Sequence, residues 1–431
     1  MPRIVESPMQ VVDRGPSVSV NEIPTSRSPT ELIQRPLPYP FRAMLAICSD
    51  LDETPDRHVY WETLRFLNTR ESTRMGMGVG LEVGNSIYFD MPADQFAYWN
   101  TDDAGRVMIQ NLIHSGHVDC LHSFGDFATT RSHAGRALQE LTRKGCQIVV
   151  WIDHGVAPSN FGSDIMQGYG DVPSSDVYHA DLTYSYGIRY VWRGRVTSVI
   201  GQNVRRHLSG IYNGHHPVAS LKTTLKEFVK GGLLNTPRGK YAMHAQNDIL
   251  RWVQLRSGHR VSEFLRANPH WGGVSCGETA EGIHEVLGTE MLNQLIKREG
   301  TCILYTHLGK IRKREEPLGS QAREAFRRLA SAYHDGNILV TTTRRLLDYC
   351  HMLNSIAVQS RTDGDCFRIE VTTRTCEPVD CSGLSFWVTD PQRTEVVLNG
   401  EKIVHLQRNR PDHTCRGSVS IPWKRLEWPA V

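Results

Sequence analysis

A pattern that occurs four times along the chain constrains its fold more than any other feature. In each copy a helix-like run with basic or histidine residues closes on glycine, and an apolar run follows that ends in a polar group. The copies read IHSG-HVDCLH, TRKG-CQIVVWIDH, KREG-TCILYTH and YHDG-NILVTTT. Glycine just past a helix end is the expected stop, because it adopts the left-handed conformation without steric cost. Continuous apolar runs indicate strands buried on both faces, so we predict a parallel sheet in an α/β fold.

Polar residues follow the predicted strands and should share one edge of the sheet. A fifth apolar run, Ala43 to Cys48, has the same kind of ending. The residues at these ends are Asp50, Asp52, His122, Asp126, Asp153, His154 and His307. The carboxyl ends of the strands form the active-site rim in α/β barrels, so we expect these side chains to gather there. His122 and Asp126 are i and i+4 and would face the same way on a helical turn, where both could reach one ion.

Three short motifs resemble those of the polysaccharide deacetylases, the NodB-homology or carbohydrate esterase family 4 group. They are ICSDLDET (Ile47 to Thr54), GHVDCLHSFGD (Gly116 to Asp126) and ILYTHLG (Ile303 to Gly309), in the family's order. The chain departs from the family pattern where Leu51 splits the aspartate pair, where Asp126 replaces the second motif histidine, and where WIDHG replaces the third motif. The resemblance spans residues 40 to 350, approximately, and implies a distorted (β/α)7 barrel.

The resemblance also implies an activity: metal-dependent hydrolysis of the N-acetyl amide of an amino sugar or glycan-related substrate. Asp50 then corresponds to the general base and His307 to the general acid. Asp52 and His122 correspond to metal ligands, and Asp126 stands at the third ligand position. A divalent metal, expected to be zinc, would polarise the carbonyl and lower the pKa of bound water. Two carboxylates with one histidine form a harder and more anionic set, which favours oxygen-loving metals and weakens the Lewis acidity of the ion.

Each of these residues also has a purely structural interpretation. Asp153 is our predicted partner for His307, since a carboxylate would help the imidazole to keep its proton near a metal. The structural alternative for Asp153 is a hydrogen bond at the rim of the barrel. Asp126 has the alternative of capping a helix that begins near Thr129. For His122 the alternative is a satisfied core histidine, and for the aspartates after the first strand it is a turn.

Two other classes of function stay open. The first is a catalytically silent member of the same fold that binds a saccharide or a partner protein, and the Asp126 replacement is the feature that keeps it open. The second is a glycoside hydrolase, which needs two carboxylates about 5 to 10 Å apart across a sugar. Asp50 with Asp153 is the pair that we nominate for that chemistry.

Composition narrows the partners and the compartment. The 431 residues contain 49 Lys and Arg against 46 Asp and Glu, and the net charge of +3 gives no electrostatic case for nucleic acid. No segment reaches the roughly 18 apolar residues of a membrane helix, so we predict no membrane span. The N-terminus lacks the apolar core of a secretory signal, which predicts a cytoplasmic location. The ten Cys fall singly in the sequence, as expected of buried reduced thiols.

The chain divides into three predicted parts. Residues 1–36 are rich in Pro, Ser and Arg and are predicted to be a mobile arm. Residues 37–353 form the deacetylase-like barrel, in which 247–256 and 261–266 are predicted helices. Residues 354–431 show short alternating runs and an Asn399-Gly400 hairpin signal, which predict a small β-sandwich-like domain.

Overall fold

A computed structural model describes residues 33–50, 53–155, 157–205, 217–232, 247–268, 279–375 and 378–430. Two predictions therefore lie partly or wholly outside the described residues. One is the assignment of Asp52 as a metal ligand, and the other is the N-terminal arm up to residue 32.

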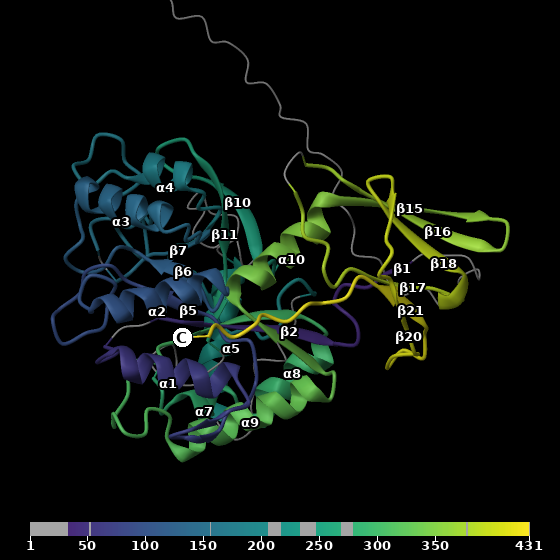
Figure 1. Cartoon of the computed structure of the whole chain (residues 1–431), viewed down its shortest axis with the longest axis horizontal. Coiled ribbons are helices and arrows are strands. Elements are labelled where there is room, and N and C mark those ends of the chain that lie inside the picture. Colours follow the sequence, from purple (N-terminus) through teal and green to yellow (C-terminus); the bar gives the residue numbers. More distant parts are fainter. Residues whose placement is uncertain are drawn as a thin grey trace, which may run out of the picture.

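A large curled sheet forms the body of the molecule (Figure 1). Its eleven strands run in the order β10-β11-β8-β7-β6-β5-β2-β13-β12-β9, with β14 paired to β2. Every pair is parallel except β10 with β11. The strands are β2 (Ala43–Ser49), β5 (Asn85–Ile87), β6 (Val118–His122), β7 (Val150–Ile152), β8 (Tyr190–Trp192), β9 (Val196–Thr197), β10 (Leu250–Gln254), β11 (Arg260–Phe264), β12 (Arg266–Ala267), β13 (Thr301–Thr306) and β14 (Ile338–Thr341). The predicted parallel sheet is thus confirmed.

Helices pack around this sheet and connect most of its strands (Figure 1). They are α1 (Arg57–Asn68), α2 (Asp103–His114), α3 (Arg131–Arg143), α4 (Ala180–Tyr186), α5 (Pro217–Gly232), α7 (Ile283–Val286), α8 (Thr289–Arg298), α9 (Ser320–His334) and α10 (Thr343–Ser355). Asp102 caps α2 by accepting a hydrogen bond from the Gly105 amide at 2.8 Å. Gly116 follows this helix at φ +81°, as the sequence pattern predicts. Across the described part of the chain, no helix combines the length and apolar character needed to cross a bilayer.

The predicted (β/α)7 barrel is wrong. The sheet has eleven strands, and it curls into a half-barrel instead of a regular sevenfold alternation of strand and helix. An antiparallel strand, β10, borders it, and β14 adds to β2 off the main path. The motifs that suggested the barrel describe only single strand ends, and nothing in them fixes how many strands a sheet recruits or how far it curls.

The two helices predicted over residues 247–256 and 261–266 are also wrong, because this segment forms strands β10, β11 and β12. Leu250 pairs with Phe264 and Gln254 with Arg260 in an antiparallel hairpin. Gly258, at φ +89°, makes its turn, since only glycine adopts this conformation without strain. The stretch then continues from β11, beside β8, into β12, beside β13. This path places Arg266 at the start of β12, from where its side chain reaches Asp50.

The C-terminal part is built of two small sheets (Figure 1). One contains β15 (Ile356–Asp363), β16 (Cys366–Thr373), β18 (Thr394–Leu398) and β19 (Glu401–Lys402), and the other contains β1 (Ile33–Gln34), β17 (Ser385–Trp387), β20 (Gln407–Asn409) and β21 (Ser418–Ser420). Asn399 and Gly400, at φ +49° and +89°, turn β18 into β19, which confirms the predicted hairpin. The last residues return to the large sheet, where the Leu426 amide donates to Glu82 at 2.9 Å.

Candidate functional site

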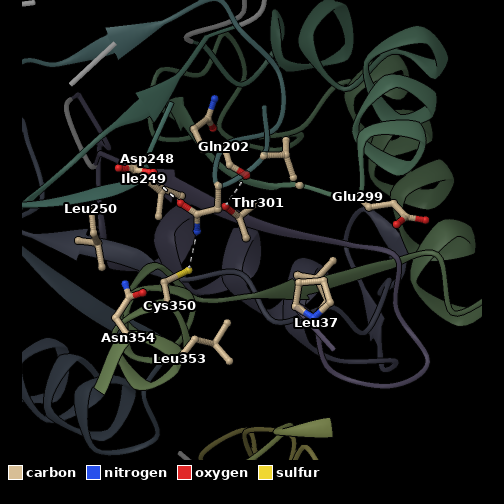
Figure 2. A pocket seen from close by; sticks show the side chains of 14 residues that line it. Leu37, Gln202, Asp248, Ile249, Leu250, Glu299, Thr301, Cys350, Leu353 and Asn354 are labelled. Atoms are coloured by element: carbon tan, nitrogen blue, oxygen red, sulfur yellow. Dashed lines mark hydrogen bonds between the residues drawn. The ribbon is translucent and has the colours of Figure 1, made fainter. Parts of the chain in front are cut away.

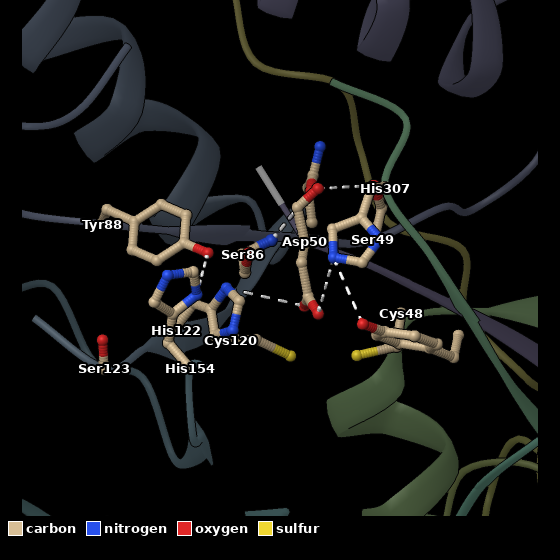
Figure 3. A network of polar contacts seen from close by, with 12 residues as sticks. Cys48, Ser49, Asp50, Ser86, Tyr88, Cys120, His122, Ser123, His154 and His307 are labelled. Atoms are coloured by element: carbon tan, nitrogen blue, oxygen red, sulfur yellow. Dashed lines mark hydrogen bonds and ion pairs between the residues drawn. The ribbon is translucent and has the colours of Figure 1, made fainter. Parts of the chain in front are cut away.

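Three of the predicted site residues meet at the carboxyl ends of the central strands. Asp50 follows β2, His122 ends β6 and His307 follows β13, and all three are at most 3% exposed. Figure 3 shows the Asp50 carboxylate between the two imidazoles. Its Oδ1 lies 3.8 Å from His122 Nδ1 and its Oδ2 lies 3.9 Å from His307 Nε2. The Asp50 amide also donates to the Thr306 carbonyl at 2.9 Å, which fixes the backbone after β2 against the end of β13.

A buried arginine that the sequence reasoning missed holds the Asp50 carboxylate from behind. Arg266 Nη1 donates to both carboxylate oxygens, at 3.0 and 2.9 Å. Its guanidinium carbon lies 3.4 Å from the centre of the Trp192 ring and 4.2 Å from that of Tyr305, so two aromatic faces enclose it. Burial acts to lower the pKa of Arg266, but the nearby Asp50 charge raises it, and the net direction is upward. Arg266 therefore keeps its positive charge in this buried position, beside the Asp50 carboxylate.

Asp126 lies beside His154, which the strand β7 and the following turn deliver. His154 Nε2 is 3.1 Å from Asp126 Oδ1, and the Tyr88 hydroxyl is 3.0 Å from His154 Nδ1. The His154 and His122 ring centres are 4.9 Å apart. Asp126 is 43% exposed, so this chain of contacts runs from the surface to the buried cluster. The capping alternative for Asp126 is wrong, because the side chain that caps α3 is that of Thr130.

Asp153 follows β7, and its carboxylate accepts hydrogen bonds from nearby N–H donors. Its Oδ1 accepts from Trp151 Nε1 at 2.8 Å and from the Phe161 amide at 2.9 Å, and its Oδ2 accepts from the Gly162 amide at 2.8 Å. Burial raises the pKa of Asp153 to about 7, against the opposing effect of these hydrogen bonds. His307 Nε2 lies 3.9 Å from Asp50 Oδ2. The described contacts of Asp153 thus hold the loop after β7.

His122 is a buried member of the predicted ligand set, and an imidazole nitrogen is a common ligand of divalent metals. Its Nδ1 lies 3.8 Å from Oδ1 of Asp50, the predicted base. Within the described ranges no group of three His, Cys, Asp or Glu side chains comes together to hold an ion. Asp52, another of the predicted ligands, lies outside these ranges.

A cavity lies at the amino end of β13. Its volume is about 320 Å³, and Gln202, Asp248, Glu299 and Thr301 are among the residues that line it (Figure 2). Thr301 begins β13, whereas His307 follows the end of the same strand, so this cavity is remote from the buried cluster. Burial raises the pKa of Asp248.

Comparisons with protein-family models, with curated proteins and with solved structures each find no match for this chain. The likeness to the polysaccharide deacetylases stays a resemblance of motifs. The geometry of the described residues has to carry any functional proposal.

Proposed function

We propose that this chain is a metal-dependent hydrolase of amide bonds that removes the N-acetyl group from an amino sugar or a glycan-related substrate. The observation that carries the proposal is the Asp50 carboxylate, held by Arg266 and placed between His122 and His307. A base and an acid on neighbouring strand ends are what amide hydrolysis requires, because water must lose a proton while the departing amine gains one.

The three residues divide the proton transfers between them. Asp50 takes a proton from the attacking water while the water oxygen bonds to the amide carbon. His307 gives a proton to the nitrogen as the carbon–nitrogen bond breaks, so acetate and a free amine are the products. The Tyr305 hydroxyl, 3.3 Å from His307 Nε2, helps to position that imidazole. A divalent ion held by His122, with Asp52 and Asp126 as the further predicted ligands, would polarise the amide carbonyl and acidify water when bound.

Arg266 fixes the Asp50 carboxylate from one side only. The guanidinium approaches from one side and leaves the two imidazole sides at distances longer than a hydrogen bond. Those sides are where a water and a substrate amide would lie. Preorganised charge of this kind needs no rearrangement during the reaction.

The glycoside hydrolase alternative is weaker on this geometry. Both oxygens of Asp153 already accept hydrogen bonds from Trp151, Phe161 and Gly162, so this carboxylate is occupied as a structural acceptor. The silent binding alternative has one observation in its favour, which is that Asp126 pairs with His154. In that case the chain would bind N-acetylated sugars without releasing acetate.

The test measures acetate release from N-acetylated amino-sugar oligomers together with metal content. We expect the wild type to contain a stoichiometric divalent metal and to release acetate, and we expect His122→Ala to lose both. Asp50→Asn should lose turnover and largely keep the metal. Asp365→Asn is the matched control, because this carboxylate is 94% exposed in the C-terminal part. Sugar binding with full metal content and no acetate would establish the silent alternative, and equal metal in His122→Ala would remove His122 from the site.

A further inference from the structure

The helix α5 (labelled in Figure 1) carries an apolar surface that faces solvent. Its exposed large side chains are Val218 (80%), Leu221 (66%), Leu225 (61%), Phe228 (67%) and Val229 (52%). At 100° per residue these five fall within one arc of about 100°, a continuous stripe along the helix. In the rest of the described structure, no other helix or strand has more than one such exposed residue.

The opposite face of α5 is polar and buried. Ser220 and Glu227 are both 0% exposed, and Lys230 Nζ lies 2.6 Å from Glu227 Oε1. A helix of a globular protein normally turns its apolar face inward and its polar face to water. Here the arrangement is reversed, so the apolar stripe is not explained by packing within the described fold.

Charge on the exposed side of α5 is of one sign. Lys222 and Lys226 are exposed and border the apolar stripe on the helical projection. The single carboxylate within Pro217–Gly232 is that of Glu227, which is buried and paired. The surface offered to a partner is therefore apolar with a cationic border.

We propose that α5 binds the surface of an anionic lipid bilayer, with its apolar stripe among the acyl chains and its lysines at the headgroups. A helix with an apolar stripe and basic border residues is the form that lies in a membrane interface. A second copy of this chain fits less well as the partner. It would place its own Lys222 and Lys226 against those of the first copy, with no exposed carboxylate on α5 to compensate the charge. The proposal goes beyond the hydrolase function and does not depend on it.

Flotation with lipid vesicles tests this directly. The full-length protein should associate with vesicles of one part phosphatidylglycerol to three parts phosphatidylcholine, and more weakly with phosphatidylcholine alone. Leu225→Glu combined with Phe228→Glu should reduce association by at least tenfold, because the two apolar side chains that would enter the bilayer are lost. Lys222→Gln with Lys226→Gln should reduce it by about fivefold for each lysine on anionic vesicles, with little change on neutral ones.

Val404→Glu is the matched control, because Val404 is 84% exposed on the C-terminal part. It should bind vesicles as the wild type does, and thermal melts should show that all variants are folded. A wild type that does not float with anionic vesicles would overturn the proposal, and so would a Leu225→Glu, Phe228→Glu variant that floats equally well. A wild type that binds no vesicles but is dimeric by light scattering, together with a monomeric Leu225→Glu, Phe228→Glu variant, would assign the stripe to a second copy instead.

Discussion

Two buried aspartates that each follow a parallel strand of the same sheet have different environments. Asp50 follows β2 and meets one charged donor, Arg266, with an imidazole on each side. Asp153 follows β7 and accepts three neutral N–H donors that occupy both of its oxygens. Both are at most 1% exposed, so burial alone does not separate them.

The difference shows what makes a buried carboxylate available for chemistry. A cation that approaches from one side compensates the charge and leaves lone pairs for water or substrate, whereas a ring of amide donors uses the lone pairs. Asp153 therefore holds a loop, while Asp50 is suited to accept a proton.

The largest effect is expected from Asp50→Asn. Turnover should fall by about 10²–10⁴-fold, the usual contribution of a general base. The free energy of unfolding should fall by about 3–5 kcal/mol, because the buried Arg266 charge loses its partner. The double variant Asp50→Asn, Arg266→Met should regain much of this stability and none of the activity. If turnover survived in the single variant, Asp50 would not be the base.

Arg266→Lys should have the next largest effect. Lysine keeps the charge, but its ammonium cannot stack between Trp192 and Tyr305 as the planar guanidinium does. We expect kcat to fall by about 10- to 100-fold, since a small displacement of a catalytic group is costly. Steady-state kinetics on the folded variant checks this. Unchanged kcat would show that charge alone positions Asp50.

Asp153→Asn should affect stability more than chemistry. The new amide would direct N–H groups at one of the donors that Asp153 now satisfies, at a cost of about 1–3 kcal/mol for the unsatisfied group. Urea denaturation measures this loss, and kcat of the folded variant should fall by less than tenfold. A fall in kcat as large as that expected for Asp50→Asn would support the predicted role of Asp153 as the partner of His307.

A further expected effect is a pH dependence of that stability difference. Burial raises the pKa of Asp153 from 3.8 to about 7, so the folded state binds its proton more tightly than the unfolded state. The stability from this proton is complete below pH 3.8 and is lost as the pH rises through about 7. The gap in unfolding free energy between wild type and Asp153→Asn should therefore narrow over this range. A gap that widens with pH would mean that the N–H donors outweigh burial.

Local sequence was sufficient wherever neighbouring residues supply the structural cause. The apolar run in the copy IHSG-HVDCLH is strand β6, and Gly116 follows α2 with the predicted positive φ. The Asn399-Gly400 turn needs only two residues that tolerate a positive φ. Placing Asp50, His122 and His307 at strand ends also followed from local patterns, since parallel strands end at a common edge.

Tertiary structure decided which partner each strand-end residue meets. Arg266 lies 216 residues from Asp50 in sequence, and no local period signals that pairing. The helices predicted over residues 247–256 and 261–266 failed because a short amphipathic run takes its conformation from the strands it pairs with, here β8 and β13. The number of strands and the curl of the sheet likewise depend on long-range pairing. The sequence by itself determined the central strands and the polar residues that follow them, whereas the contacts that distinguish Asp50 from Asp153 arise only when distant segments pack together.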